Sequence, residues 1–233
     1  MTLVLVVRHG LTAATGTALS GRTPGIPLDD RGRAQAAAVA KRLAQVRLDA
    51  IISSPLERCA QTAAAIAEQQ SPAAEVTTED RLIEVGYGDW TGQSLRKLSR
   101  EPLWRVVQAH PSAVTFPGPG GEALPDMERR AVSAIRDWNA RLGPEAVYLI
   151  CSHADVIKAI LADSLGLHLD LYQRIQIDPC SLSAIRFTPL RPFVERMNDT
   201  GGSVKALTRS DKTTAGTSAL RPGDAPVGGG AGG

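Results

Sequence analysis

Three apolar runs of the sequence are each followed by side chains that carry a positive charge or can take a proton. These are Arg8 and His9 after residues 3–7, Arg58 after residues 50–53, and His153 after residues 147–151. Guanidinium groups match the oxygens of a phosphoryl group. A neutral imidazole can attack phosphorus through one ring nitrogen when its other nitrogen is held by a hydrogen bond. We therefore expect a phosphate site with His9 as its nucleophile.

The residue after His9 and a later acidic segment complete this expectation. Gly10 is expected to let the backbone turn tightly and to bring a substrate close to the imidazole. Expelling an alkoxide requires an acid, and the segment DRLIEVGYGDWTG at 80–92 places Glu84 in mostly apolar surroundings. Partial burial and a nearby phosphate raise the pKa of such a carboxyl, which suits Glu84 to give a proton and later accept one from water.

The apolar runs that precede these residues indicate strands covered on both faces. Residues 3–7, 50–53 and 147–151 lack polar alternation, and residues 30–46 and 126–142 carry apolar side chains at helical spacing. This alternation predicts an α/β fold, a three-layer sandwich in which a largely parallel central sheet is flanked by helices. The carboxyl ends of parallel strands face one crevice, so the fold would bring the four cationic groups together.

Other segments predict the remaining organisation of the chain. Ser54-Pro55-Leu56-Glu57 predicts a helix start with Ser54 as the cap and Glu57 completing a capping box. Residues 181–187 and 193–198 predict a final strand pair. We expect one domain at 1–199 and a Gly-, Pro- and Thr-rich disordered tail at 200–233.

Composition limits the class of protein and of partner. The chain has 233 residues, 43% hydrophobic and 21% charged, with a net charge of +2, which does not favour nucleic acid or an anionic membrane as a partner. The apolar N-terminal stretch is too short for a signal peptide or a membrane span, so we expect a cytoplasmic protein. Three cysteines without zinc-type spacing predict buried free thiols. The sequence leaves the oligomeric state open, a homodimer included.

Four motifs, in order, resemble those of the histidine phosphatase superfamily, also called phosphoglycerate mutase-like. They are RHG at 8–10, SSPLERCAQTA at 53–63, RLIEVGYGDWTG at 81–92 and LICSHADVIKAIL at 149–161. The resemblance covers about residues 3–199, and the motifs together are far more specific than RHG alone.

The resemblance implies a role for each matching residue. His9 would be the phosphorylated nucleophile, Glu84 the acid and base, and Arg8, Arg58 and His153 ligands of the phosphoryl group, with no metal or other cofactor. Thr15 stands where many members have an Asn that helps to hold phosphate, and Ala154 stands where Gly commonly follows the second His. Thr15 and Arg22 are counted among the candidate phosphate-binding residues.

Three functions are compatible with this site. The segment GYGDWTGQS after Glu84 is short and resembles the phosphatase branch, which favours hydrolysis of a small phosphorylated substrate. Actinobacterial-type relatives with the CSHADVIK variant are often described as probable phosphomutases, so transfer within the substrate is an alternative. A phospholigand-binding protein without turnover is the third, and the presence of Glu84 speaks against it.

Three local features have competing interpretations. His153 and Asp155 could form half of a metal site, but Asp155 is better explained as a helix-start residue. CSLSAIR at 180–186 has the spacing of cysteine-dependent phosphatases, but its strand-like pattern would hold Cys180 and Arg186 roughly 20 Å apart. The region of Trp104 and Phe116 could be an insertion that covers the pocket, or ordinary core.

Overall fold

Six strands form one sheet at the centre of the computed structural model, which describes residues 1–201. The strands are β1 (Thr2–Arg8), β2 (Ala50–Ser53), β3 (Val76–Thr78), β4 (Val147–Ser152), β5 (Leu182–Phe187) and β6 (Pro192–Asp199). They lie in the order β3-β2-β4-β1-β5-β6. The pairings of β2 with β3, β2 with β4 and β1 with β4 are parallel, and β5 runs antiparallel to its neighbours β1 and β6. The prediction of a largely parallel sheet is therefore confirmed.

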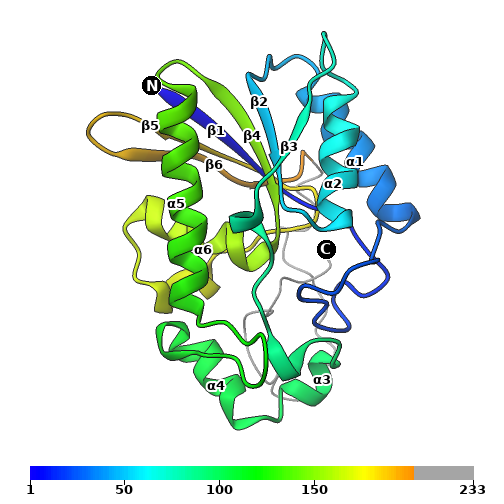
Figure 1. Cartoon of the computed structure of the whole chain (residues 1–233), viewed down its shortest axis with the longest axis vertical. Helices are drawn as coiled ribbons and strands as arrows, with labels where there is room; N and C mark the ends of the chain where they lie inside the picture. Colours follow the sequence, from blue (N-terminus) through cyan, green and yellow to red (C-terminus); the bar gives the residue numbers. More distant parts are fainter. Residues whose placement is uncertain (202–233) are drawn as a thin grey trace, which may run out of the picture.

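Helices cover both faces of this sheet, as Figure 1 shows. They are α1 (Asp30–Leu43), α2 (Glu57–Ala67), α3 (Leu95–Leu98), α4 (Pro102–Ala109), α5 (Leu124–Leu142) and α6 (Ala154–Leu165). Helices α1 and α2 lie together on one face, and α5 and α6 lie together on the other. This is the three-layer sandwich that the sequence predicts.

The unbroken apolar character of the central strands follows from these two layers. Val4 and Val6 of β1 point into the core beneath α5 and α6, whereas Leu5 and Val7 point into the core beneath α1 and α2. Successive side chains of a strand alternate between faces, so a strand covered on both faces needs apolar residues throughout. The final strand pair is also confirmed as β5 and β6.

The start of α2 differs from the prediction. The helix begins at Glu57 with Leu56 as its N-cap, and no side chain caps it. Ser54 lies before the helix, and its hydroxyl contacts His153 Nε2 at 2.8 Å. It also accepts from the amide of the N-cap Leu56 over 3.4 Å, but not from the amide of Glu57, as a capping box would require. The predicted capping box at Ser54-Pro55-Leu56-Glu57 is therefore wrong, because a tertiary contact takes up the serine hydroxyl.

Helices α3 and α4 lie beyond the end of the sheet, in the lower part of Figure 1. Trp104 of α4 and Phe116, which follows this helix, form an aromatic cluster with the segment after Glu84. The ring of Trp104 stacks on Trp90, with centroids 6.1 Å apart, and Phe116 packs edge-on against both Tyr87 and Trp90. Trp104 and Phe116 are thus core residues of this part of the fold.

The remaining predictions concern the thiols, the membrane and the end of the chain. Cys59, Cys151 and Cys180 are buried and free, as predicted. Within residues 1–201, no helix combines the length and the apolar character needed to cross a bilayer. The tail predicted at 200–233 lies, from residue 202 on, outside the described residues.

Candidate active site

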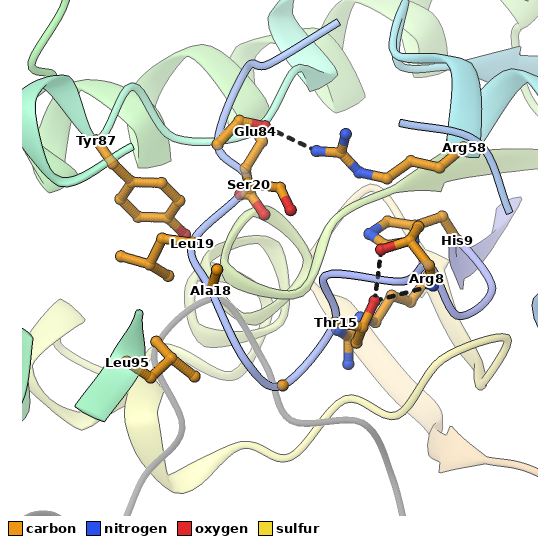
Figure 2. Close-up of a pocket in the computed structure, with 13 residues that line it drawn as sticks. Arg8, His9, Thr15, Ala18, Leu19, Ser20, Arg58, Glu84, Tyr87 and Leu95 are labelled. Carbon is orange, nitrogen blue, oxygen red and sulfur yellow. Dashed lines mark hydrogen bonds between the residues drawn. The ribbon is translucent and has the colours of Figure 1, made fainter. Parts of the chain in front are cut away.

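A pocket of about 390 Å³, measured with its opening to solvent, lies where β1 and β4 end and α2 begins. Figure 2 shows side chains from distant parts of the chain converging on it. Its lining combines a cationic floor with a small apolar wall. The lining residues are Arg8, His9, Thr12, Thr15, Gly16, Ala18, Leu19, Ser20, Gly21, Arg58, Glu84, Tyr87 and Leu95.

His9 follows the last residue of β1 and is held in one orientation. Its Nδ1 lies 2.7 Å from the carbonyl oxygen of Gly10. A carbonyl can only accept a hydrogen bond, so Nδ1 carries the proton and the lone pair of the neutral ring lies on Nε2. Burial, with the charges of Arg58 and Arg8, lowers the pKa of His9 well below its usual range. The imidazole is therefore neutral and has one nitrogen ready to act as a nucleophile.

Two arginines are fixed beside His9 by main-chain carbonyls. Arg8 Nη1 donates to the oxygen of Ile177 over 2.8 Å, and Arg58 Nη2 donates to the oxygen of Gly21 over 2.7 Å. Both side chains are almost fully buried. Arg58 Nη1 is buried and has no hydrogen-bond partner among residues 1–201. A buried guanidinium in this state favours an anionic partner.

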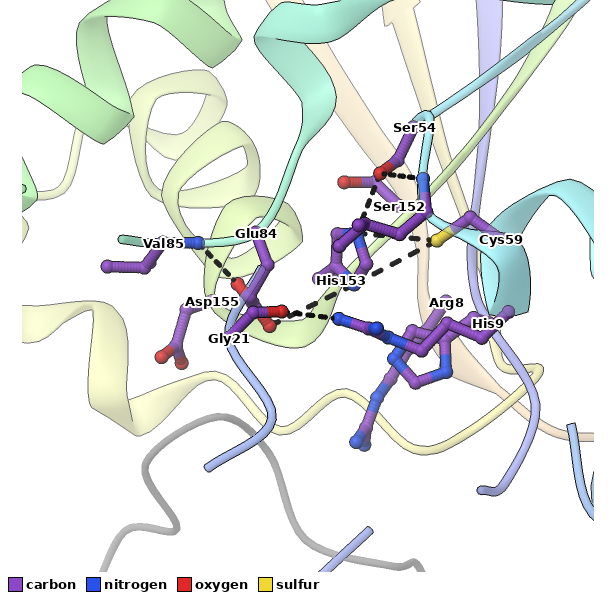
Figure 3. A network of polar contacts seen from close by, with 12 residues as sticks. Arg8, His9, Gly21, Ser54, Cys59, Glu84, Val85, Ser152, His153 and Asp155 are labelled. Atoms are coloured by element: carbon purple, nitrogen blue, oxygen red, sulfur yellow. Dashed lines mark hydrogen bonds and ion pairs between the residues drawn. The ribbon is translucent and has the colours of Figure 1, made fainter. Parts of the chain in front are cut away.

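His153 lies between β4 and α6 and contacts three other elements of the site. Its ring centroid is 5.2 Å from that of His9, and its Nε2 lies 2.8 Å from the Ser54 hydroxyl. Cys59 Sγ lies 3.5 Å from the same nitrogen (Figure 3). Burial is the main cause that lowers the pKa of His153 well below its usual range, and Arg58 is the next. His153 is thus neutral like His9, and it lies behind the lining residues of the pocket.

Glu84 enters the pocket from the loop between two 3₁₀ turns, η1 (Asp80–Leu82) and η2 (Gly88–Trp90). Its side chain is buried, with Oε2 at 4.0 Å from His153 Nδ1 and Oε1 accepting from the amide of Val85 over 3.0 Å. Burial and the charge of Asp155 raise the pKa of Glu84 to about 7 against the opposing effect of the arginines. A carboxyl with this pKa can both give and take a proton near neutral pH.

The backbone of Glu84 is held by residues that the sequence does not single out for this task. Arg22 Nε and Arg130 Nη2 both donate to its carbonyl oxygen, over 2.8 Å and 3.2 Å. Glu122 accepts from both arginines and from the amide of Gly86. Glu122 thus connects the segments of Arg22, Gly86 and Arg130. The only sequence signal for it is its place after the Gly-rich turn at 118–121, which says nothing about these partners.

The two further candidates for phosphate binding occupy different positions. Thr15 lines the pocket, and its hydroxyl accepts from the amide of Thr12 over 3.0 Å. Arg22 is not among the lining residues, and its guanidinium forms an ion pair with Glu122 at 2.9 Å. The structure therefore brings Thr15 to the site together with Arg8, His9, Arg58 and Glu84, and it places Arg22 behind Glu84.

Gly10 is required for a different reason from the predicted one. Its φ is not in the left-handed region, so the turn after His9 does not depend on glycine. A Cβ at this position would lie 2.6 Å from the carbonyl oxygen of Gly32 in α1. The absence of a side chain thus allows the end of β1 to lie against the start of α1.

The sequence suggested two alternative sites, a metal site at His153 and Asp155 and a phosphate loop at 180–186. In the folded chain, side chains of both form other contacts. Asp155 lies in the first turn of α6, as predicted, and its carboxylate accepts from Tyr87 and pairs with Lys158. No group of three or more His, Cys, Asp or Glu side chains in residues 1–201 is placed to hold a metal ion. Arg186 lies on β5 and pairs with Glu195, while burial raises the pKa of the Cys180 thiol to about 12. The C-x₅-R spacing therefore does not form a phosphate loop.

Comparison with known proteins supports the assignment of this pocket as a phosphate site. Residues 4–200 match the sequence profile of the histidine phosphatase superfamily (branch 1). The chain is 31% identical over 206 residues to phosphoserine phosphatase 1 of Hydrogenobacter thermophilus, covering 86% of this chain and 93% of that protein. It is 29% identical to a probable phosphoglycerate mutase of Proteus mirabilis, covering 89% and 96%.

A solved structure shares the fold. The crystal structure of phosphoserine phosphatase from Entamoeba histolytica in complex with 3-phosphoglyceric acid superposes with a TM-score of 0.75. The match covers 85% of this chain and 98% of that one, at 23% identity. At this identity the similarity establishes the architecture, and the chemistry has to be derived from the pocket itself.

Proposed function

Because the chain belongs to the histidine phosphatase superfamily (branch 1), we propose that it hydrolyses a phosphate monoester through a phosphohistidine intermediate on His9. The observation that carries the proposal is the hydrogen bond from His9 Nδ1 to the Gly10 carbonyl. It leaves the Nε2 lone pair available in a pocket whose other charged groups are two buried arginines and Glu84. We assign the catalytic domain to residues 1–199.

In the first step His9 Nε2 attacks phosphorus and the bond from phosphorus to the ester oxygen breaks. Arg8 and Arg58 neutralise charge on the non-bridging oxygens, and neutral His153 donates a hydrogen bond to one of them; stabilising this charge is the main catalytic need in phosphoryl transfer. Glu84, with its raised pKa, gives its proton to the departing alkoxide. The alcohol leaves, and His9 is phosphorylated.

In the second step a water molecule attacks the phosphorus of phosphohistidine. Glu84, now a carboxylate, takes a proton from that water, and the bond between phosphorus and Nε2 breaks. Inorganic phosphate and neutral His9 result, with Glu84 protonated again. The burial and the neighbouring arginines that keep His9 neutral before the reaction also favour its return to the neutral form. The proposed cycle uses no metal ion or other cofactor.

The substrate is a small phosphorylated molecule. Arg8 and Arg58 supply charge for a phosphoryl group, and Ala18, Leu19 and Leu95 supply an apolar wall beside them that suits a compact alcohol. Relatives are described as acting on phosphoserine or as probable phosphoglycerate mutases, which makes these phosphoesters the first to test.

The test combines product analysis with trapping of the intermediate. The protein is incubated with a panel of sugar phosphates, phosphoglycerates, nucleotides and phosphoamino acids, and free phosphate and isomerised phosphoester are measured. We expect phosphate release and, after quenching, an acid-labile and base-stable phosphoryl group on His9. His9→Ala should abolish the adduct and turnover together.

Two other outcomes would contradict hydrolysis. An isomerised phosphoester without net phosphate release would identify a phosphomutase. Tight binding of phosphoesters with neither product would identify a phospholigand-binding protein. Retention of turnover in His9→Ala would overturn the role of His9 itself.

A further inference from the structure

We propose that Asp155 is a positioning residue whose buried negative charge keeps the proton on Glu84, with Lys158 and Tyr87 holding that charge in place. This inference rests on the proposed function, because it concerns the acid of that reaction. The two steps above do not need Asp155, yet its carboxylate is buried beside the pocket together with that of Glu84.

The carboxyl group of Asp155 has a hydrogen-bond donor on one oxygen and a cation near the other. Tyr87 donates its hydroxyl hydrogen to Asp155 Oδ2 over 2.8 Å, and Lys158 Nζ lies 3.6 Å from Oδ1. The side chains of Asp155 and Lys158 are each only 1% exposed. A buried carboxylate is costly unless it is paired and hydrogen-bonded, and both conditions are met here.

Lys158 is itself fixed from the other side. Its Nζ donates to Gln173 Oε1 over 3.0 Å and lies 5.7 Å from the centre of the Tyr172 ring. Tyr172 and Gln173 belong to η4 (Leu169–Arg174), and Lys158 lies one turn beyond Asp155 on α6. These contacts hold the ammonium on the side of Asp155 that faces η4, while Tyr87 reaches Asp155 from the pocket wall.

Asp155 acts on Glu84 because both lie at the N-terminal end of α6, where Figure 3 draws their side chains near each other. Glu84 Oε2 is 4.0 Å from Nδ1 of His153, the N-cap of this helix, and Asp155 belongs to its first turn. The charged and titratable groups around the Glu84 carboxyl come from four parts of the fold. They are Arg8 at the end of β1, Arg58 of α2, His153 before α6, and Asp155 with its partners Tyr87 and Lys158. Both arginines favour loss of the Glu84 proton, and Asp155 is the anion among these groups that opposes them.

The opposing effects of Asp155 and the arginines on the Glu84 pKa matter because the phosphate site and the acid have conflicting requirements. A pocket that binds a phosphoryl group needs cations, but the same cations stabilise the ionised form of a neighbouring acid. A second anion beside Glu84 adds to the effect of burial and opposes the cations, so it favours the protonated form of the acid. The order of effects agrees with this view, since Asp155 is, after burial, the largest cause that raises the pKa of Glu84.

The experiment measures kcat/KM against pH with an alkyl phosphate monoester found active in the substrate panel. In the unchanged protein, activity should fall on the alkaline side near the Glu84 pKa of about 7. In Asp155→Asn we expect this alkaline limb to move to lower pH by about one unit or more, because removal of a like charge lets Glu84 ionise earlier.

A second substrate separates an effect on the acid from general damage. p-Nitrophenolate leaves without needing a proton, so formation of phosphoenzyme from p-nitrophenyl phosphate should change little in Asp155→Asn. A merely structural role would lower the rates with both substrates in parallel and leave the alkaline limb in place. As a matched control, Asp163→Asn removes a carboxylate of the same helix that pairs with Arg136, and its pH profile should be unchanged.

The double variant Asp155→Asn/Lys158→Met covers the case in which the single variant leaves an unpaired ammonium and does not fold. It removes both buried charges, and the limb should still move to lower pH because Asp155 has the larger effect on Glu84. An unshifted limb in either folded variant, with normal activity in the unchanged protein, overturns this inference alone. A chain that forms no phosphohistidine overturns the proposed function instead.

Discussion

The same buried surroundings shift the pKa values of His9 and Glu84 in opposite directions. Burial disfavours charge, so it lowers the pKa of the His9 imidazole and raises that of the Glu84 carboxyl. The imidazole is thereby neutral and able to act as a nucleophile, and the carboxyl keeps its proton up to about pH 7 and can act as an acid. Opposite shifts in neighbouring groups are a common basis for assigning acid and base roles in an active site.

Replacement of Glu84 tests this division of roles at the level of one residue. Glu84→Gln cannot give a proton to an alkoxide, so turnover of an alkyl phosphate should fall by about 100-fold to 10,000-fold. With p-nitrophenyl phosphate the first step needs no acid, whereas hydrolysis of the intermediate still needs a base. We therefore expect a burst of p-nitrophenol and accumulation of phosphohistidine, measured by rapid quenching. Steady turnover of both substrates at the original rate would refute the role of Glu84.

The ends of the elements decide which side chains reach the pocket. Strands β1 and β4 deliver Arg8, His9 and His153 because they are parallel neighbours and end at the same edge. The first turn of α2 delivers Arg58, and Ser54 in the loop before it contacts His153. A serine with the sequence context of a helix cap is thus part of the site.

Ser54→Ala distinguishes a role in the site from a role in capping the helix. If the hydroxyl positions His153, kcat/KM should fall by about fivefold to tenfold, the equivalent of about 1 kcal/mol for one hydrogen bond. Amide hydrogen exchange in the first turn of α2 should stay as slow as before. Ser164→Ala is the control, because that hydroxyl donates to the backbone of its own helix. Faster exchange at the start of α2 with unchanged activity would restore the capping role.

The shifted groups of the pocket also affect the stability of the whole molecule. His9 and His153 bind protons below about pH 6.5 only when the chain is unfolded, so their contribution to the free energy of unfolding is present above that pH and lost as pH falls. Glu84 acts in the opposite sense, because its contribution is present below about 4.5 and lost as pH rises through 7. Two histidines outweigh one carboxyl between these limits.

We therefore expect the free energy of unfolding to fall by roughly 1 kcal/mol for each pH unit between pH 6 and 5. Urea denaturation at constant ionic strength, followed by circular dichroism, measures it. In His9→Asn/His153→Asn only the Glu84 contribution remains, so the dependence on pH should reverse in sign. A gain in stability of the unchanged protein on acidification would contradict the neutral state of the two imidazoles.

The layered α/β fold and the residues that meet at the ends of its central strands could be predicted from the order of residue types along the chain. Apolar runs identify buried parallel strands whatever lies around them, and the rule that such strands end at one edge brings His9, Arg58 and His153 together. The four motifs then identified the family, because their joint order along the chain is specific. Strand β3 escaped this reasoning, since it has only three residues and is mostly exposed.

Only the tertiary structure decided how the site residues are supported. Arg22 holds the backbone of Glu84 across 62 positions of sequence, Ser54 contacts His153 across 99, and Tyr87 reaches Asp155 across 68. Contacts of this kind depend on how layers pack and leave no periodic pattern along the chain. The apolar surroundings of Glu84 in the sequence predicted the direction of its pKa shift, but the neutral state of His9 and His153 depends on burial and on neighbouring arginines that only the folded chain brings together.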